Sequence, residues 1–149
     1  MLIVEPGDPR APGASALLSA SHTLMARLFP ADDIYALDLD ALCAPGIRFF
    51  IARDGDQTLG TAALALRDGY GEVKSMFTSE QARGKGVAAA LLRQIEDEAR
   101  SENRAALKLE TGEELAAAIR LYERHGFTRC ARFGDYAANQ TSVYMQKSL

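Results

Sequence analysis

The sequence has little of what metal sites, disulfide frameworks and membrane spans are made from. Its 149 residues include two cysteines, Cys43 and Cys130, and two histidines, His22 and His125. Two cysteines are too few for the disulfide framework of a small secreted protein, and no metal site is predicted from so few soft ligands. The start "MLIVEPGDPR" lacks the features of a signal peptide, and no apolar run approaches the roughly 20 residues of a membrane span. We therefore expect a cytoplasmic protein without a membrane partner.

An excess of positive charge is also missing. The chain has 17 Lys and Arg residues against 20 Asp and Glu residues, a net charge of −3. Nucleic-acid-binding proteins usually carry a basic face, so no nucleic-acid partner is expected. The length suits one domain with a buried core, and residues 1–149 are predicted to form it.

The spacing of apolar residues predicts alternating strands and helices. Strand patterns occur at 1–6, 47–53, 58–67, 72–78, 104–111, 127–133 and 142–149. Helix patterns occur at 15–29, around Asp40 as a cap, at 86–101 with Glu96 on the water-facing side, and at 112–126. Turn signals "DGDQ" and "DGYG" join the middle strands as antiparallel hairpins. The order predicts a mixed, mostly antiparallel α/β (α+β) sheet flanked by helices.

The stretch "RGKGVA" places two glycines and two cations where a strand gives way to a helix. The first N–H groups of a helix have no partner and favour an anion, while glycine lets backbone approach it closely. A phosphate site and an ordinary solvated turn both fit this pattern. Gly84, Gly86 and Ala89 also fit a dinucleotide fingerprint, but the preceding hairpins are not the repeated βαβ units that such a fold needs.

Two motifs in order resemble the GCN5-related N-acetyltransferase (GNAT) family. Arg83, Gly86 and Ala88 match its acetyl-CoA loop, Arg/Gln-x-x-Gly-x-Gly/Ala, and "AIRLYERHGF" matches its second signature. The resemblance covers roughly Glu72 to Phe133, with a strand before the loop at the expected distance. It implies a sheet splayed at the fourth strand and acetyl-CoA as cosubstrate. The family's frequent asparagine near Leu115 is absent, so that cofactor contact is not predicted.

The resemblance also implies roles for individual residues. Backbone at Met76, Phe77 and Thr78 is expected to pair with pantetheine. The pyrophosphate is expected on the loop residues Arg83, Gly84, Lys85, Gly86, Val87 and Ala88. Tyr122 is predicted as the general acid and Glu72 as the base, with Glu110 or a water molecule as alternatives. The acceptor contacts implied are Tyr35, Asp38, Lys74, Ser75, Asp135 and Tyr136.

The leading hypothesis is an N-acetyltransferase that transfers acetyl directly from acetyl-CoA to a primary amine of a small molecule or peptide. A dinucleotide-dependent enzyme and a non-catalytic acyl-CoA-binding module are the alternatives. The identity of the acceptor, the preferred acyl group and the oligomeric state, including a homodimer, stay open at this level.

Overall fold

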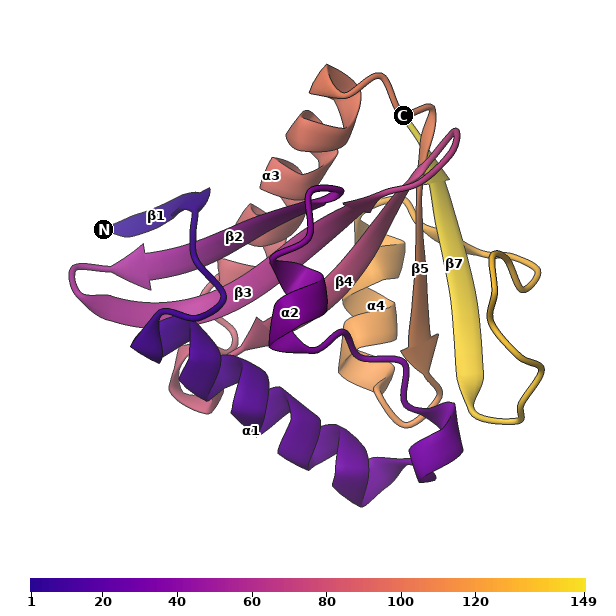
Figure 1. Cartoon of the computed structure of the whole chain (residues 1–149), viewed down its shortest axis with the longest axis horizontal. Coiled ribbons are helices and arrows are strands. Elements are labelled where there is room, and N and C mark those ends of the chain that lie inside the picture. Colours follow the sequence, from indigo (N-terminus) through magenta and orange to yellow (C-terminus); the bar gives the residue numbers. More distant parts are fainter.

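The computed structural model describes residues 1–149 and contains one seven-stranded sheet with helices on both faces (Figure 1). The strands are β1 (Leu2–Pro6), β2 (Ile47–Asp54), β3 (Gln57–Leu66), β4 (Gly71–Thr78), β5 (Ala106–Gly112), β6 (Thr128–Arg129) and β7 (Ser142–Ser148). The helices are α1 (Pro12–Leu28), α2 (Leu39–Leu42), α3 (Val87–Ser101) and α4 (Ala116–Arg124), with short 3₁₀ helices at Ala31–Asp33 and Glu80–Ala82. No helix combines the length and apolar character needed to cross a membrane.

The sheet has the order β1-β2-β3-β4-β5-β7-β6, and every neighbouring pair is antiparallel except β4 and β5. This confirms the predicted mixed, mostly antiparallel α/β fold. It also shows that the dinucleotide alternative is wrong, because a doubly wound nucleotide-binding sheet is mostly parallel.

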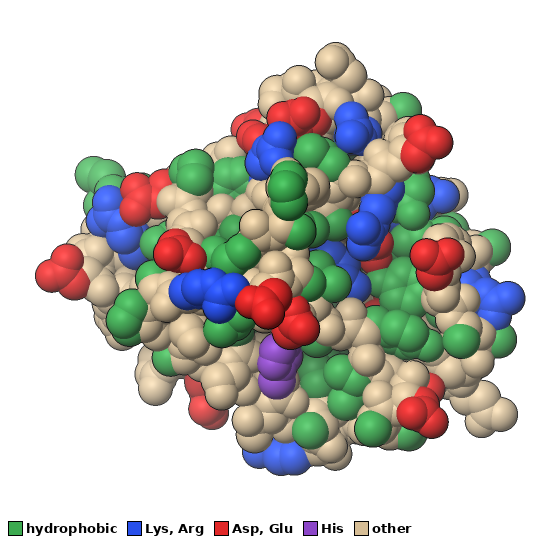
Figure 2. Space-filling model, viewed as in Figure 1, with side chains coloured by type: hydrophobic (Ala, Val, Ile, Leu, Met, Phe, Trp, Pro, Cys, Tyr) green, Lys and Arg blue, Asp and Glu red, His purple; other side chains and the backbone are tan.

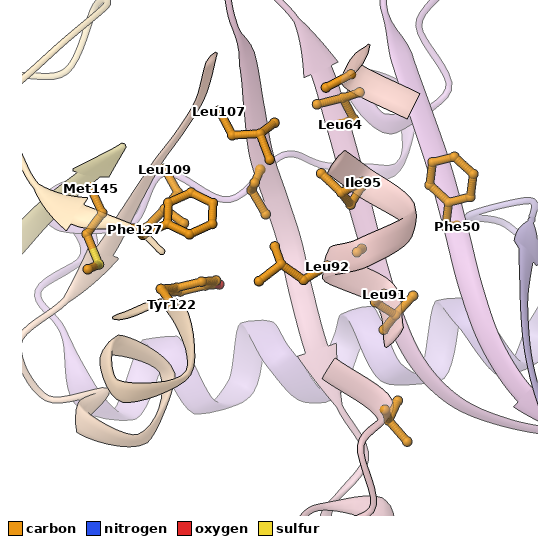
Figure 3. Packing of buried hydrophobic residues seen from close by; sticks show 14 of the residues in the cluster. Phe50, Leu64, Leu91, Leu92, Ile95, Leu107, Leu109, Tyr122, Phe127 and Met145 are labelled. Carbon is orange, nitrogen blue, oxygen red and sulfur yellow. The ribbon is translucent and has the colours of Figure 1, made fainter. Parts of the chain in front are cut away.

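The main core lies between the sheet and the pair α3 and α4 (Figures 1 and 3). Leu91, Leu92 and Ile95 on α3 are completely buried, and each contributes about 1.5–3 kcal/mol through burial of apolar surface. Apolar residues of α3 recur every three or four positions, so one face of the helix meets the sheet. A smaller cluster on the opposite face packs α1 and α2 against β2 and β3.

β4 and β5 separate almost as soon as they meet. Only Gly71 with Leu107 and Glu72 with Lys108 are paired across them. From Val73 to Thr78, β4 is paired with β3 alone, so its other edge has no strand partner. Figure 1 shows the two strands spreading apart, with α4 visible behind the opening.

A β-bulge in β4 accompanies this separation. Thr61 of β3 pairs with Phe77, whereas Ala63 pairs with Lys74, so Ala62 faces two residues of β4. Ser75, one of these two, has φ of +53°, a left-handed conformation that costs roughly 1 kcal/mol or more in a non-glycine residue. The Thr61 hydroxyl donates to the Ser75 carbonyl at 2.8 Å and stabilises the bulge. A bulge bends its strand, which turns the end of β4 away from β5.

Three local predictions are wrong. Asp38, not Asp40, caps α2, because its carboxylate accepts the Ala41 N–H. Glu96 is buried instead of facing water, and it forms an ion pair with Lys147 of β7. The predicted strand 127–133 is only Thr128–Arg129, and Cys130, which follows it, is half-buried.

Gly60 allows the start of α3 to pack closely on β3. A Cβ atom at this position would lie 2.8 Å from Val87 Cγ1 and 3.0 Å from the Phe77 carbonyl oxygen. We predict that Gly60→Ala lowers the free energy of unfolding by about 1–3 kcal/mol, because the backbone oxygen cannot move aside as a side chain would.

Gly46→Ala is the matched control, because a Cβ there would meet nothing within 4 Å. Its effect should stay within about 0.5 kcal/mol. Urea denaturation of both variants checks the prediction, and equal stabilities would contradict it.

Candidate active site

The opening between β4 and β5 leads into a cavity of about 150 Å³. Its walls come from β4, β5, α1, α4 and the connection after α1. Five residues predicted for the site line it: Tyr35, Lys74, Ser75, Met76 and Tyr122. Glu110, the alternative base, lines the same cavity.

Tyr122 lies on α4 at the boundary between the core and the cavity. Its side chain is buried, and its ring packs edge-on against Phe127 with centroids 5.6 Å apart (Figure 3). Burial and, to a lesser extent, the negative charge of Glu110 raise the pKa of Tyr122 well above its usual range. The phenol therefore stays protonated at neutral pH and is able to donate a proton.

Glu110 reaches the cavity because side chains alternate along β5. Its neighbour Leu109 points into the core on the α3–α4 face, so Glu110 points to the opposite face. The Ser142 hydroxyl donates to Glu110 Oε2 at 2.7 Å. Burial raises the pKa of Glu110, while the Ser142 hydrogen bond and the charge of Lys74 act in the opposite direction. A half-buried carboxylate with a raised pKa suits proton abstraction near neutral pH.

Glu72, the predicted base, lies outside this cavity. Its carboxylate accepts a hydrogen bond from Arg67 Nε at 3.1 Å and another from the Tyr136 hydroxyl, and Lys74 Nζ lies 3.7 Å away. Its side chain is only 4% exposed, so these partners hold the charge where water is excluded. The geometry favours Glu110 as the base, and the predicted role of Glu72 stays untested.

A second cavity, of about 290 Å³, lies beside the first and shares Tyr35 and Lys74 with it. Glu72, Asp135 and Tyr136 also line it. The structure thus brings the predicted acceptor residues together around two neighbouring spaces. Asp38 is the exception, because it lines neither cavity and caps α2 instead.

Lys74 lies between the two cavities and bonds to the residues that separate them. Its ammonium donates to the Tyr35 carbonyl at 3.1 Å and to the Tyr136 hydroxyl at 2.9 Å, which joins two loops that are far apart in sequence. Burial lowers the pKa of Lys74 in spite of the neighbouring carboxylates of Glu72 and Glu110. The Tyr35 and Tyr136 rings pack edge-to-face 4.8 Å apart and complete this separation.

The loop between β4 and α3 presents a row of free backbone donors. No N–H group from Gly84 to Ala89 donates to an acceptor within the chain, and the first hydrogen bond of α3 runs from Ala90 to Gly86. Gly84 and Gly86 have φ of +78° and +81°, a conformation that favours glycine. Arg83 and Lys85 are exposed beside these donors. Such a concave set of N–H groups with cations fits a phosphate.

The face that carries α1 and α2 shows cationic and anionic side chains interspersed (Figure 2). Charged atoms are also visible deep in a hollow bordered by hydrophobic side chains on this face (Figure 2). A charged side chain that is removed from water requires a partner. Glu72 and Lys74 are such partners for each other, because they form an ion pair.

Four residues near Glu110 were not predicted for the site: Asp33, Asn139, Thr141 and Ser142. They come from the connection after α1, from the end of the β6–β7 loop and from the first residue of β7, and they meet through hydrogen bonds. They form no motif along the chain, and only the pairing of β5 with β7 brings Ser142 to Glu110.

Comparisons with known proteins place the chain among acetyltransferases. A family model described as "Acetyltransferase (GNAT) family" matches residues 17–127. The "IAA acetyltransferase" of Azospirillum brasilense is 44% identical over 124 residues, covering 82% of this chain and 81% of that protein.

Solved structures share the fold. A putative acyl-CoA N-acyltransferase from Klebsiella pneumoniae is 29% identical with a TM-score of 0.88, covering 100% of this chain and 98% of that one. A GNAT family acetyltransferase from Elizabethkingia anophelis with acetyl-CoA bound, 14% identical, has a TM-score of 0.71 and covers 99% and 98% of the two chains. These matches support an acyltransferase enzyme rather than a non-catalytic binding module.

The raised pKa of Glu110 has a consequence for stability. Its folded-state pKa lies above its unfolded-state value, so ionisation of Glu110 opposes folding. This penalty is absent when the pH is below the pKa of Glu110 in the unfolded state. It grows as the pH rises through the pKa of Glu110 in the folded state. Glu110→Gln keeps an acceptor for Ser142 but cannot ionise. We therefore predict that the variant gains thermal stability over the wild type as pH rises from about 4 to about 8.

Differential scanning calorimetry at a series of pH values checks this. The difference in Tm between the two proteins should be smallest at the acidic end. A difference that does not change with pH would contradict the prediction.

Proposed function

The chain belongs to the GNAT acetyltransferase family and is an acetyl-CoA-dependent acyltransferase, and from this premise we propose that it acetylates a primary amine of a small molecule or peptide by direct transfer. One observation carries the proposal. A half-buried carboxylate, Glu110, and a buried phenol, Tyr122, line one cavity at the divergence of β4 and β5. Acyl transfer to an amine needs a proton acceptor and a proton donor around one space.

The free edges of the protein backbone fit acetyl-CoA. We propose that the unpaired edge of β4 at Met76, Phe77 and Thr78 binds pantetheine as an added strand would. The N–H groups from Gly84 to Ala88, with Arg83 and Lys85, are proposed to bind the pyrophosphate. The support is that both sets of backbone groups lack partners within the chain.

Acetyl-CoA supplies an activated thioester, and the residues of the cavity manage the protons. In the proposed mechanism Glu110 removes a proton from the acceptor ammonium, which leaves a neutral nitrogen able to attack the carbonyl carbon. The new C–N bond forms as the C–S bond breaks, and Tyr122 donates its proton to the departing sulfur. Glu110 releases its first proton to solvent and then accepts the remaining excess proton from nitrogen, which it also releases to solvent. Tyr122 regains a proton from solvent.

The charges of the cavity support a cationic acceptor. Glu110 and Asp33 line it, and neither forms an ion pair within 4.0 Å. Lys74 is the one lysine or arginine on the lining, and it already donates to Tyr35 and Tyr136. A protonated amine is therefore attracted to the two carboxylates before it is deprotonated.

We predict that Tyr122→Phe and Glu110→Gln each lower kcat by about 10²-fold or more, because general acid–base catalysis contributes on that order. Glu72→Gln should lower kcat much less, since Glu72 lies outside the catalytic cavity. Release of free coenzyme A thiol is measured with acetyl-CoA across a panel of primary amines.

The Glu72 and Glu110 variants are matched, because each replaces a carboxylate by an isosteric amide. If Glu72→Gln stops turnover and Glu110→Gln does not, Glu72 is the base. If the wild type releases no thiol with any amine in a wide panel, the proposed acceptor class is wrong.

The glycine loop gives a separate prediction. Gly86→Ala should weaken acetyl-CoA binding about tenfold or more, because φ of +81° is unfavourable for alanine and the loop donors would move. Gly69→Ala is the control. Gly69 has φ of +82° and open space around its Cβ position, but it lies in the turn between β3 and β4.

Both variants should lose about 1 kcal/mol of stability through the same backbone strain. Only Gly86→Ala should change the dissociation constant for acetyl-CoA in isothermal titration calorimetry. Equal affinities for the two variants would show that the loop does not hold the cofactor.

A further inference from the structure

The Glu110 carboxylate lies at the end of a chain of hydrogen bonds that starts in the loop between β6 and β7. Asn139 Nδ2 donates to Ser142 Oγ at 3.0 Å, and Ser142 Oγ donates to Glu110 Oε2 at 2.7 Å. Asn139 and Ser142 are half-buried, so these bonds are shielded in part from water.

The orientation of the Asn139 amide is fixed by the backbone. Its Oδ1 atom accepts the N–H of Thr141 at 2.9 Å and the N–H of Ser142 at 2.8 Å. Backbone N–H groups only donate, so the atom facing them must be the oxygen. The amide nitrogen therefore faces Ser142, and a flipped amide would lose both backbone bonds.

This orientation fixes the direction of the Ser142 hydroxyl in turn. The Asn139 nitrogen is only a donor, so Ser142 Oγ must accept from it with a lone pair. The hydroxyl proton is left free for the Glu110 carboxylate, which in its ionised form only accepts. A hydroxyl that is oriented in advance makes a better hydrogen bond to an anion than one that is free to rotate.

The same loop is tied to the segment after α1. The Thr141 hydroxyl donates to Asp33 Oδ2 at 2.9 Å. Asp33 and Thr141 both line the catalytic cavity. The loop in which this series of hydrogen bonds begins is thus attached to two sides of the cavity, at Asp33 and at Glu110.

We propose that Asn139 and Ser142 are positioning residues for the catalytic carboxylate: Asn139 orients the Ser142 hydroxyl, and Ser142 holds Glu110 in place and favours its ionised form. This inference rests on the proposed role of Glu110 as the base. It assigns a function to the end of the β6–β7 loop, which carries neither of the two family motifs.

Several other groups face Glu110 and influence its titration. Lys74 favours the ionised form, whereas the charges of Glu72 and Asp33 oppose it. These neighbours are Lys74 and Glu72 on β4, Asp33 after α1, Tyr122 on α4, Tyr136 in the β6–β7 loop, and Tyr144 on β7. Of all these groups, only Ser142 donates a hydrogen bond to Glu110.

The test is to titrate Glu110 in the protein without substrate. Glutamate labelled with ¹³C at the carboxyl carbon reports the midpoint by NMR, and Glu110→Gln identifies the signal. We predict that Ser142→Ala moves the midpoint of Glu110 to higher pH, because the ionised form loses its donor. Ser142→Thr keeps the hydroxyl and should keep the wild-type midpoint.

Tyr144→Phe is the matched control. Tyr144 pairs with Glu110 across β5 and β7, and its hydroxyl, which lies near Ser142, makes no hydrogen bond to Glu110. Removal of this hydroxyl should leave the Glu110 midpoint where it is in the wild type. A shift as large as that of Ser142→Ala would show that the midpoint responds to any local change, and the proposal would be overturned.

The role of Asn139 is tested by a double-mutant cycle. Asn139→Asp keeps the oxygen that accepts the two backbone N–H groups but removes the donor to Ser142. Its added charge acts through space in any background, whereas the effect through Ser142 needs the hydroxyl. Asn139→Asp should therefore shift the Glu110 midpoint more in the wild-type background than in Ser142→Ala. Equal shifts would refute the action through Ser142.

Kinetics separate this inference from the proposed function. If Ser142→Ala also moves the acidic limb of the kcat/KM profile to higher pH, the two agree. If Glu110→Gln keeps full turnover while Ser142→Ala still shifts the NMR midpoint, the positioning stands and the role of Glu110 as base is wrong. If Glu110→Gln is inactive and Ser142→Ala shifts neither midpoint nor limb, the base assignment stands and the positioning proposal fails.

Discussion

The separation of β4 from β5 is the constraint on which the rest of the structure depends. Two residue pairs join the strands, and beyond them both strands have an unpaired edge. A continuous ladder would satisfy these backbone groups internally and close the space between the strands. The bulge at Ser75 bends β4 away, and its strain is held by Thr61 on the neighbouring strand. α3 and α4 cover one face of the sheet and bury the main core there. The opening between β4 and β5 leads into the cavity.

Glu72 and Glu110 lie on adjacent strands, but their carboxylates have different hydrogen-bond and ion-pair partners. Glu72 is enclosed with Arg67, Lys74 and the Tyr136 hydroxyl, a set that neutralises it and ties loops together. Glu110 is half-buried with a single hydrogen-bond donor, Ser142, and partial desolvation raises its pKa. The first arrangement favours a structural ion-pair network, whereas the second keeps a carboxylate able to exchange a proton. The proposed roles of the two carboxylates therefore rest on their surroundings and not on the residue type.

Much of the fold could be predicted from local patterns. Alternating apolar residues, turn sequences and helix periodicity gave the order of the elements, and the two motifs gave the family and the cofactor. Errors occurred where a distant partner overrides the local pattern. Glu96 has the sequence position of a surface residue, but Lys147 from β7 neutralises it in the interior. Cys130 has apolar neighbours, yet β6 ends at Arg129 and leaves it half-buried.

The sequence by itself determined the glycine loop, because the conformation that Gly84 and Gly86 adopt is a property of single residues, and the backbone donors follow from where α3 begins. It also determined the acid candidate, Tyr122, through a motif that lies within one helix and its following turn. Only the tertiary structure showed that Glu110 and not Glu72 lines the cavity with Tyr122, and that Asn139 and Ser142 lie beside Glu110. Those assignments depend on the alignment of β5 with β7 and on the exclusion of water, which arise from contacts between residues far apart in the chain.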